Sequence, residues 1–493
     1  MSENGQPRAR PGATWEDMEA LGPTQAYAAA ASRDPRFDGL FFVGVTTTGI
    51  YCRPVCTART PARDRCKFFR HAAEAEREGF RACFLCRPEL APGNSTVDRT
   101  ARLATLAAQR IEQGEADLDA LAESLGVTAR HLRRVLAREL GVSPVELRQS
   151  KRIALAKQLL CDTRLPITEV AYASGFASVR RFNALFRARF DRSPTEARRG
   201  RGPRERGDGT AIRLRLDYRP PFDWGALLAF LRDRAIPGVE EATADAYRRT
   251  VRIHDRTGWI SVSPDGDALT CEVSLSLTPV LMPLVARVRA LFDLDAQPRA
   301  VADALSTHRR LAPLVRRSPG LRVPGAVDGF ELAVRSILGQ QISVAGARTL
   351  AGKLAARYGE RVSTPFAGLC RLFPTPAALA RSGWRGVPRA RSRAIALIAS
   401  AVSKGTLDLA PTADVERTRV ALSELPGIGA WTAEYIAMRA LRWPDAFPAE
   451  DLIVRRALGS PARAIEALES VRPWRAYAVM HLWRNHEVDD SAR

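Results

Sequence analysis

The chain has 493 residues, 46% of them hydrophobic, and a formal net charge of +21 at pH 7. This length exceeds one hydrophobic core, so several domains are expected, and the Arg-rich excess of positive charge favours a nucleic-acid partner. No apolar run is long enough to span a membrane and the N-terminus lacks a signal core, so we expect a cytoplasmic protein without a membrane partner.

The first informative segment contains four cysteines, Cys52, Cys56, Cys83 and Cys86. Their spacing, Cys-x3-Cys and Cys-x2-Cys separated by 26 residues, is typical of a site that holds one Zn²⁺ ion tetrahedrally. Closed four-ligand sites are usually structural, and spacing alone favours that role. A zinc-bound thiolate remains a nucleophile, however, when basic neighbours such as Arg53 offset its charge.

Residues 100–199 have a helical pattern that contains a weak internal repeat. In each half a short helix ends at a Gly turn, and a second helix begins near Thr128 or Ser178. This pattern predicts two helix-turn-helix units, with a plain helical bundle as the alternative. The candidate DNA contacts on the second helices are Arg130, Arg133, Arg134, Arg180 and Arg181.

Residues 200–210 are polar and rich in Gly and Arg, which predicts a flexible linker that lets two halves act separately. The next segment, 211–295, has mixed character, and from 296 to 493 the pattern returns to helices broken by Pro and Gly. Strand-like patterns in the mixed segment occupy residues 212–216, 251–253, 259–262 and 269–275.

Two stretches of the first half resemble known families. Gly175-Phe176, with Ser178, Phe182 and Phe186 and a following Ser-Pro, resembles the second half of an AraC-type DNA-binding domain. The segments 47–56 and 79–86, which contain the four cysteines, resemble the N-terminal domain of the bacterial Ada adaptive-response proteins. The order of the two domains is also that of the Ada family.

The Ada resemblance implies that Cys52 irreversibly accepts a methyl group from a methyl phosphotriester in DNA. Four thiolates on Zn²⁺ carry a formal charge of −2, so methylation of one sulfur reduces the repulsion from DNA phosphates. The resemblance therefore implies a transcription activator that methylation switches on. A purely structural zinc site is the rival interpretation. No Pro-Cys-His-Arg motif is present, so direct repair of O6-alkylguanine is not expected.

Residues 423–435 contain Leu-Pro-Gly-Ile-Gly between two helical stretches, which is typical of a helix-hairpin-helix turn. Gly427 and Gly429 allow a phosphate to approach the backbone, and the following helix offers free N–H groups. The carbonyls of Ser423, Leu425 and Gly427 are candidate ligands for a monovalent cation. The turn by itself is equally consistent with a generic pair of antiparallel helices.

Asp451 lies 22 residues after Gly429. A purely structural role for this residue would be to cap a helix that begins at Leu452. A hairpin followed by this aspartate resembles the base-excision DNA glycosylases. The stretch from Leu214 to the C-terminus resembles the AlkA-type 3-methyladenine DNA glycosylases, with further matching motifs at 218–224, 336–345 and 473–483.

This second resemblance implies that the enzyme flips an alkylated purine out of the duplex, with Gln341 as the wedge that fills the gap. Asp451 would stabilise the positively charged sugar or activate water. No Lys stands at the position before Asp451 where the lyases of this superfamily carry one, so the resemblance implies a monofunctional glycosylase without lyase activity. The candidate pocket residues, each of which could alternatively be plain core, are Phe230, Trp431, Tyr435 and Trp483.

We therefore expect a multidomain fold, mainly α with α+β parts. Its function would be to excise purines of the 3-methyladenine and 7-methylguanine class and to activate transcription after methyl transfer to Cys52. The alternative is a regulator whose glycosylase-like half binds DNA without catalysis. Partners would be alkylated and promoter double-stranded DNA, with RNA polymerase as a further candidate, and the protein would be a monomer.

The expected domains follow one another along the chain. They are a small zinc-bound α/β domain at 1–95, an AraC-type double helix-turn-helix at 100–199, a linker at 200–210, an α+β AlkA-type N-terminal domain at 211–295 and an all-α helix-hairpin-helix glycosylase domain at 296–493.

Overall fold

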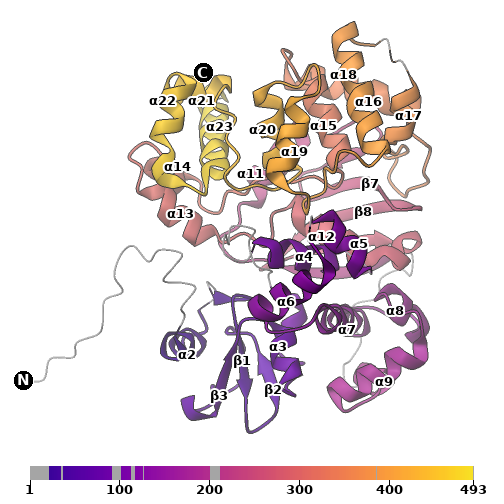
Figure 1. Ribbon diagram of the computed structural model, residues 1–493, viewed down its shortest axis with the longest axis vertical. Coiled ribbons are helices and arrows are strands. Elements are labelled where there is room, and N and C mark those ends of the chain that lie inside the picture. Colours follow the sequence, from indigo (N-terminus) through magenta and orange to yellow (C-terminus); the bar gives the residue numbers. More distant parts are fainter. Residues whose placement is uncertain are drawn as a thin grey trace, which may run out of the picture.

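The computed structural model describes residues 22–34, 37–91, 102–112, 117–125, 127–199, 211–382, 384 and 386–491. The predicted linker at 200–210 lies outside the described residues, as do the first 21 residues of the expected zinc domain. Figure 1 shows a small sheet at one end of the molecule, a larger sheet in the middle and a group of helices at the other end. Among the described residues, no helix combines the length and apolarity that a membrane span requires.

The small sheet has the strand order β3-β1-β2-β4 and contains the segment of the four cysteines. Strand β1 pairs antiparallel with β2 and β3, whereas β2 and β4 run parallel, so the carboxyl ends of β2 and β4 lie at one edge. Its elements are α2 (Pro23–Ala31), β1 (Phe42–Val45), β2 (Ile50–Cys52), η2 (Arg63–Arg65), β3 (Cys66–Phe69), α3 (Ala72–Arg77), β4 (Arg81–Ala82) and η3 (Pro88–Leu90).

The next helices form the two predicted helix-turn-helix units. Thr128 caps α6 by accepting from the His131 N–H, and Ser178 caps α9 by accepting from the Arg181 N–H. Gly175 has a φ of 81°, which lets the chain turn sharply between α8 and α9. The helices are α4 (Arg102–Glu112), α5 (Leu118–Ser124), α6 (Ala129–Leu140), α7 (Pro144–Asp162), α8 (Ile167–Ala173), α9 (Val179–Phe190) and α10 (Pro194–Arg199).

The larger sheet has the order β5-β9-β8-β7-β6, and all its neighbouring strands are antiparallel. The four predicted strands are confirmed, and the short edge strand β6 was not predicted. Its elements are β5 (Ala211–Asp217), α11 (Trp224–Asp233), β6 (Glu240–Ala242), β7 (Tyr247–Ile253), β8 (Arg256–Asp265), β9 (Ala268–Ser274), η4 (Leu275–Val280) and α12 (Leu281–Leu291).

The remaining elements of the described chain are helices joined by loops, so the predicted mixture of a mainly α fold with α+β parts is confirmed. The helices are α13 (Pro298–Ser306), α14 (Ala312–Arg317), α15 (Gly329–Leu338), α16 (Val344–Tyr358), α17 (Pro376–Ser382), α18 (Arg389–Ser403), α19 (Val415–Ser423), α20 (Ala430–Arg439), α21 (Leu452–Leu458), α22 (Pro461–Ala467), η5 (Glu469–Val471) and α23 (Arg475–Ser491).

The N-terminal half (residues 22–199) packs directly against the C-terminal half (residues 211–491). Buried side chains of both halves belong to one continuous hydrophobic cluster. Polar contacts cross the boundary as well: Gln158 Nε2 donates to the Arg215 carbonyl at 2.9 Å, and Arg110 donates to the Thr412 carbonyl at 3.1 Å. The sequence suggested halves that act separately, whereas the structure holds them in contact.

Candidate functional site

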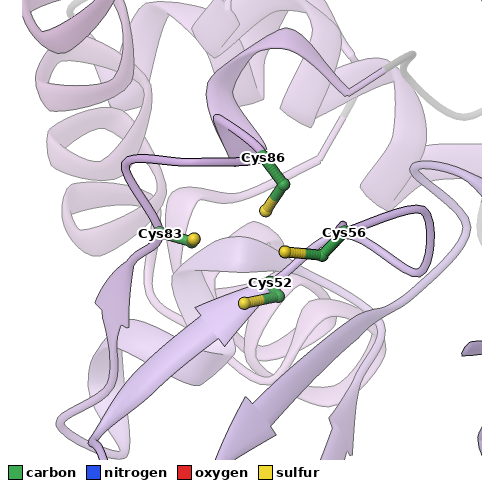
Figure 2. Close-up of side chains that lie close together, drawn as sticks. All are labelled: Cys52, Cys56, Cys83 and Cys86. Atoms are coloured by element: carbon green, nitrogen blue, oxygen red, sulfur yellow. The ribbon is translucent and has the colours of Figure 1, made fainter. Parts of the chain in front are cut away.

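The four cysteines converge on one point, as Figure 2 shows, and their sulfur atoms all lie within 4.8 Å of one another. Cys52 ends β2 and Cys83 follows β4, so the parallel pairing of these strands brings the two halves of the motif together. Zn–S bonds of about 2.3 Å would place tetrahedral ligands about 3.8 Å apart, so this set of thiols fits Zn²⁺.

Backbone groups and one lysine fix the loops that carry the sulfurs. The Arg53 N–H donates to Cys86 Sγ at 3.3 Å, and the Leu85 N–H donates to Cys83 Sγ at 3.4 Å. Lys157 on α7, whose side chain is 1% exposed, donates to the Cys83 carbonyl at 2.6 Å. Such contacts orient metal ligands and spread the negative charge of a thiolate cluster.

Arg53 was expected to offset the charge of the sulfurs, but its guanidinium group is already paired. It forms ion pairs with Asp38 and with Asp217, and it also donates to the Cys86 carbonyl at 3.2 Å. Lys67, another basic residue near the first cysteine pair, forms an ion pair with Glu78. Part of the positive charge at this site is therefore balanced by carboxylates.

The second candidate site centres on the Asp451 carboxylate, which caps α21. Its Oδ1 atom accepts from the N–H groups of Ile453 and Val454, as the capping interpretation predicted. The same oxygen accepts from Trp483 Nε1 at 3.0 Å, and Oδ2 accepts from Trp431 Nε1 at 3.0 Å. Four donors therefore hold this carboxylate in one orientation, two of them from helices remote in sequence.

The four predicted pocket aromatics lie together beside Asp451. Trp431 stacks on Tyr435 with a centroid distance of 5.1 Å, and Tyr435 is 6.1 Å from Trp483. Phe230 is parallel to Trp483 at 6.5 Å, with an interplanar angle of 11°. The sequence did not predict that the indole N–H groups of Trp431 and Trp483 donate hydrogen bonds to the Asp451 carboxylate.

Two arginines that sequence reasoning missed border these rings. The guanidinium carbon of Arg439 lies 4.9 Å from the Phe230 centroid, and Arg439 Nη1 donates to the Tyr435 hydroxyl at 2.6 Å. Arg234 covers Phe230 at 3.6 Å. Burial alone would raise the pKa of the Tyr435 phenol, but Arg439 and Arg234 outweigh burial and lower it. The four aromatic side chains are therefore bordered by two positive charges that the sequence analysis did not predict.

The predicted hairpin turn lies between α19 and α20. Gly429 precedes α20 as its cap residue, and Gly427 has a φ of 92°, a conformation that favours glycine. The Gly427 carbonyl accepts from Gln340 Nε2 at 2.9 Å, and the Leu425 carbonyl accepts from the Ile428 N–H. Two of the three carbonyls proposed for a cation thus already have hydrogen-bond partners.

The wedge candidate Gln341 lies between α15 and α16 and is exposed, with a φ of 57°. Its neighbour Gln340 ties this turn to the hairpin, since it also donates to Thr432 Oγ1 at 3.1 Å. Arg391 donates to the Gln340 carbonyl at 2.6 Å. The structure therefore joins the wedge turn and the hairpin turn through Gln340, which the sequence gave no reason to select.

The five candidate arginines of the helix-turn-helix units lie apart from the carboxylate site. All are exposed, on helices whose opposite faces are buried by residues such as Leu132, Leu136, Phe182 and Phe186. They are Arg130, Arg133 and Arg134 on α6, and Arg180 and Arg181 on α9.

Three family models match the chain in the predicted order. The metal binding domain of Ada matches residues 25–89, a helix-turn-helix domain matches 121–200, and the AlkA N-terminal domain matches 213–328. These matches confirm the resemblances on which the sequence analysis relied, and the four-cysteine cluster agrees with a zinc-binding domain.

Curated relatives cover the whole arrangement and its parts. The chain is 41% identical over 94% of its length to the "Probable bifunctional transcriptional activator/DNA repair enzyme AlkA" of Mycobacterium tuberculosis, of which it covers 96%. It is 37% identical to "DNA-3-methyladenine glycosylase 2" of Escherichia coli, over 54% of this chain and 95% of that protein. With "Bifunctional transcriptional activator/DNA repair enzyme Ada" of Escherichia coli it shares 34% identity, over 30% of this chain and 42% of that protein.

Proposed function

This chain belongs to the family of bifunctional transcriptional activator/DNA repair enzymes that includes AlkA of Mycobacterium tuberculosis, and we propose that it treats alkylated DNA at two sites. In its C-terminal half it is a DNA-3-methyladenine glycosylase that releases the damaged base through Asp451. In its N-terminal half Cys52 accepts a methyl group from the damaged backbone, and the helix-turn-helix units direct transcription. The position of Asp451 among four aromatic side chains supports the first role most strongly.

In the glycosylase reaction the bond between the sugar and the alkylated purine breaks, and water adds to the sugar. Positive charge develops on the sugar as the base leaves, and a carboxylate held in place stabilises that charge without reorganisation. Asp451 meets this requirement because four donors fix it next to the aromatic group. Because these hydrogen bonds occupy most of the lone pairs of the carboxylate, we assign Asp451 to charge stabilisation rather than to removal of a proton from water.

The aromatic side chains then bind the flipped base, and Gln341 occupies the gap that the base leaves in the duplex. An alkylated purine is a cation, so stacking on electron-rich rings favours it. Arg439 and Arg234 oppose this preference, because they place positive charge over Phe230. We therefore expect modest discrimination between cationic and neutral damaged bases. The hairpin turn at Gly427 and Gly429 binds the phosphate backbone, and a monovalent cation there would share the Gly427 carbonyl with the Gln340 contact.

The glycosylase proposal is tested by measuring free purines released from methylated duplex DNA. Wild-type protein is expected to release 3-methyladenine and 7-methylguanine. The Asp451→Asn variant is expected to release them about 10²–10³-fold more slowly. Glu450→Gln is the matched control, since it removes the adjacent carboxylate and should retain activity. Release by Asp451→Asn at the wild-type rate would remove Asp451 from the mechanism. No release by wild type would instead favour a regulator whose C-terminal half only binds DNA.

In the methyl-transfer step Cys52 Sγ forms a bond to the methyl carbon while the bond from that carbon to the phosphate oxygen breaks. The leaving group is an ordinary phosphodiester, so the step requires no further reactant. Cys52, Cys56, Cys83 and Cys86 would hold Zn²⁺, which would keep their sulfurs deprotonated at neutral pH. Cys52 is partly exposed at the end of β2, where a backbone phosphate can approach it.

The methyl-acceptor proposal is tested by intact-protein mass after incubation with methylated duplex. The wild-type mass should rise by one methyl group, and the modified peptide should contain Cys52. Cys52→Ser should show no increase, whereas Cys66→Ser, which lies outside the sulfur cluster, should behave like wild type. Methylation at a different cysteine would overturn the assignment, and an unchanged wild-type mass would make the zinc site purely structural.

For the regulatory role, the exposed arginines of α6 and α9 contact promoter DNA, with RNA polymerase as the expected partner. We also propose a monomer whose domains are divided as the sequence suggested, with boundaries near residues 95, 199, 210 and 295. Methylated and unmethylated protein should differ in their affinity for promoter DNA, because methylation removes one negative charge from the sulfur cluster. Equal affinities would contradict this switch.

A further inference from the structure

The helices beside the Asp451 pocket carry exposed arginines that the proposed reactions do not use. Residues 298–317, which include α13 and α14, and residues 452–467, which include α21 and α22, contain eight arginines and two carboxylates. All eight arginine side chains are exposed, and none of them forms an ion pair with another described residue. We call the exposed side of these two segments the arginine face.

Acidic residues on the neighbouring elements do not neutralise the arginine face. Glu469 on η5 pairs with Arg472, and Glu487 on α23 pairs with Arg484, so each has an arginine of its own outside the face. The two aspartates at 489–490 reduce the total charge of this region without cancelling it. A surface of unpaired guanidinium groups attracts a polyanion, and two-point contacts to phosphate oxygens are among its strongest interactions.

The arginine face begins next to the pocket. Asp451 caps α21, and a rise of about 1.5 Å per residue places Arg455 and Arg456 about 6–8 Å further along the same helix. Arg310 connects the second segment to the first, because its Nη1 donates to the Ala457 carbonyl near the end of α21. Positive charge therefore extends from the helix that Asp451 caps to the turn between α13 and α14.

The hairpin turn and the wedge lie on the other side of the pocket. Arg391 near the start of α18 donates to the Gln340 carbonyl, and Gln340 joins the wedge turn to the hairpin turn. Figure 1 shows α13, α14, α21 and α22 on one side of the C-terminal half and α16 and α18 on the other, with α20 between them. A duplex whose damaged base enters the pocket would therefore have one arm at the hairpin turn and the other at the arginine face.

Base flipping gives a mechanical role to both arms of the duplex. Insertion of a wedge kinks the DNA, and bending a site costs about 1–6 kcal/mol, which the contacts permitted by the bend must offset. Duplex DNA is stiff on the length scale of one protein, so an arm that is not held can swing back and restore the stack. A stable kink therefore requires contacts on both sides of the damaged base.

We propose that the arginine face binds backbone phosphates on the arm of the damaged duplex that lies away from the hairpin turn, and that this contact holds the kink while the base is in the pocket. The proposal rests on the proposed glycosylase function. The hairpin turn offers backbone N–H groups to phosphate, whereas the arginine face offers full positive charges. Its contribution should therefore depend strongly on salt and should not depend on base sequence.

The experiment measures kcat/KM for release of 7-methylguanine from a duplex that contains a single such base, at several salt concentrations. Full-length wild type is compared with the double variant Arg309→Ala/Arg455→Ala, which removes one exposed arginine from each segment of the face. Arg357→Ala/Arg361→Ala is the matched control, because these exposed arginines lie at the end of α16 that is remote from the wedge turn. Three duplexes are used: one with two long arms, and two in which one or the other arm is shorter than a helical turn.

The double variant should reduce the slope of log kcat/KM against log salt concentration by about 1.8, the value for two lost phosphate contacts, and the control should match wild type. Shortening one arm should lower kcat/KM for wild type but not for the double variant, whereas shortening the other arm should lower both alike. The proposal fails if the double variant keeps the wild-type slope, or if it remains sensitive to both arms. A wild-type protein that releases no base would overturn the glycosylase function and this proposal together.

Discussion

The sulfur site and the carboxylate site are assembled from very different lengths of chain. All four sulfur ligands come from residues 52–86, two of them at the edge where β2 and β4 run parallel. The carboxylate site gathers residues 230–483, and its geometry depends on α11, α20, α21 and α23 lying against one another. A metal can organise the first site locally, whereas only the packed C-terminal half can organise the second. The two sites should therefore respond to different perturbations.

Removal of zinc should have the largest effect, and it should inactivate the sulfur site without inactivating the carboxylate site. A chelator should abolish methyl uptake and loosen residues 50–86, because binding of Zn²⁺ to small four-ligand domains contributes about 10–16 kcal/mol. Base release should persist, since none of the four sulfur ligands belongs to the aromatic group. Zinc content, protein mass and released purines would be measured on the same samples. A parallel decline of zinc content and base release would contradict the separation.

Loss of one indole donor should affect only the carboxylate site. Trp483→Phe keeps a ring but removes the N–H that reaches Asp451, so kcat for base release should fall about 10–100-fold, which corresponds to a charged hydrogen bond of about 1.5–3 kcal/mol. Trp431→Phe should behave in the same way. Phe230→Leu removes a stacking ring without a donor, so it should raise KM more than it lowers kcat. If all three variants changed KM alone, the indoles would serve only as stacking surfaces.

Acid should weaken the C-terminal half through His481 on α23. Burial lowers the pKa of His481 to about 4 from its ordinary value of 6.5. Below pH 6.5 the unfolded state binds a proton that the folded state does not accept until about pH 4, so stability is full above pH 6.5 and is lost as pH falls. This group alone should cost about 2 kcal/mol between pH 7 and pH 5.

Hydrogen exchange of α23 at both pH values would measure this loss as a free energy of opening. His481→Gln should reduce the difference between the two pH values, and substitution of the exposed His254 by Gln should leave it unchanged. An equal difference in wild type and His481→Gln would assign the acid sensitivity of α23 to other groups.

The smallest effect concerns the exposed arginines of α9, which belong to neither chemical site. Arg181→Ala should reduce the dependence of DNA affinity on salt concentration by a slope of about 0.9, the value for one lost phosphate contact. Base release from a short methylated duplex should not change. Arg232→Ala, an exposed arginine on α11, serves as the control. Binding of promoter DNA that is insensitive to Arg181→Ala would remove this residue from the predicted interface.

The contrast between a site built from neighbouring residues and a site built from distant ones also explains what the sequence could predict. Cysteine spacing predicts the sulfur cluster because its members are near neighbours along the chain. Strand-like stretches of sequence likewise predicted β5, β7, β8 and β9. The turn residues likewise predicted both helix-turn-helix units. Each of these features depends on local sequence, where side-chain periodicity and turn chemistry are direct signals.

Contacts between distant segments left no such signal. The pairing of Arg53 with Asp217 joins residues from different domains, and the indole of Trp483 reaches Asp451 across 32 positions. Charged residues and tryptophans occur in many other roles, so the sequence alone does not show which of them contact one another. Only the folded structure identifies these two pairs. The roles of Asp451 and Cys52 were likewise suggested by resemblance to known families rather than by spacing, and they stay predictions until the variants are measured.

The central claim is that one chain performs two separate reactions on methylated DNA, and one incubation tests it most directly. Wild-type protein, Cys52→Ser and Asp451→Asn are each mixed with methylated duplex, and protein mass and free purines are measured in the same tube. We predict both products for wild type, purines alone for Cys52→Ser and the mass increase alone for Asp451→Asn. Loss of both products in either variant, or both products in all three proteins, would contradict the account.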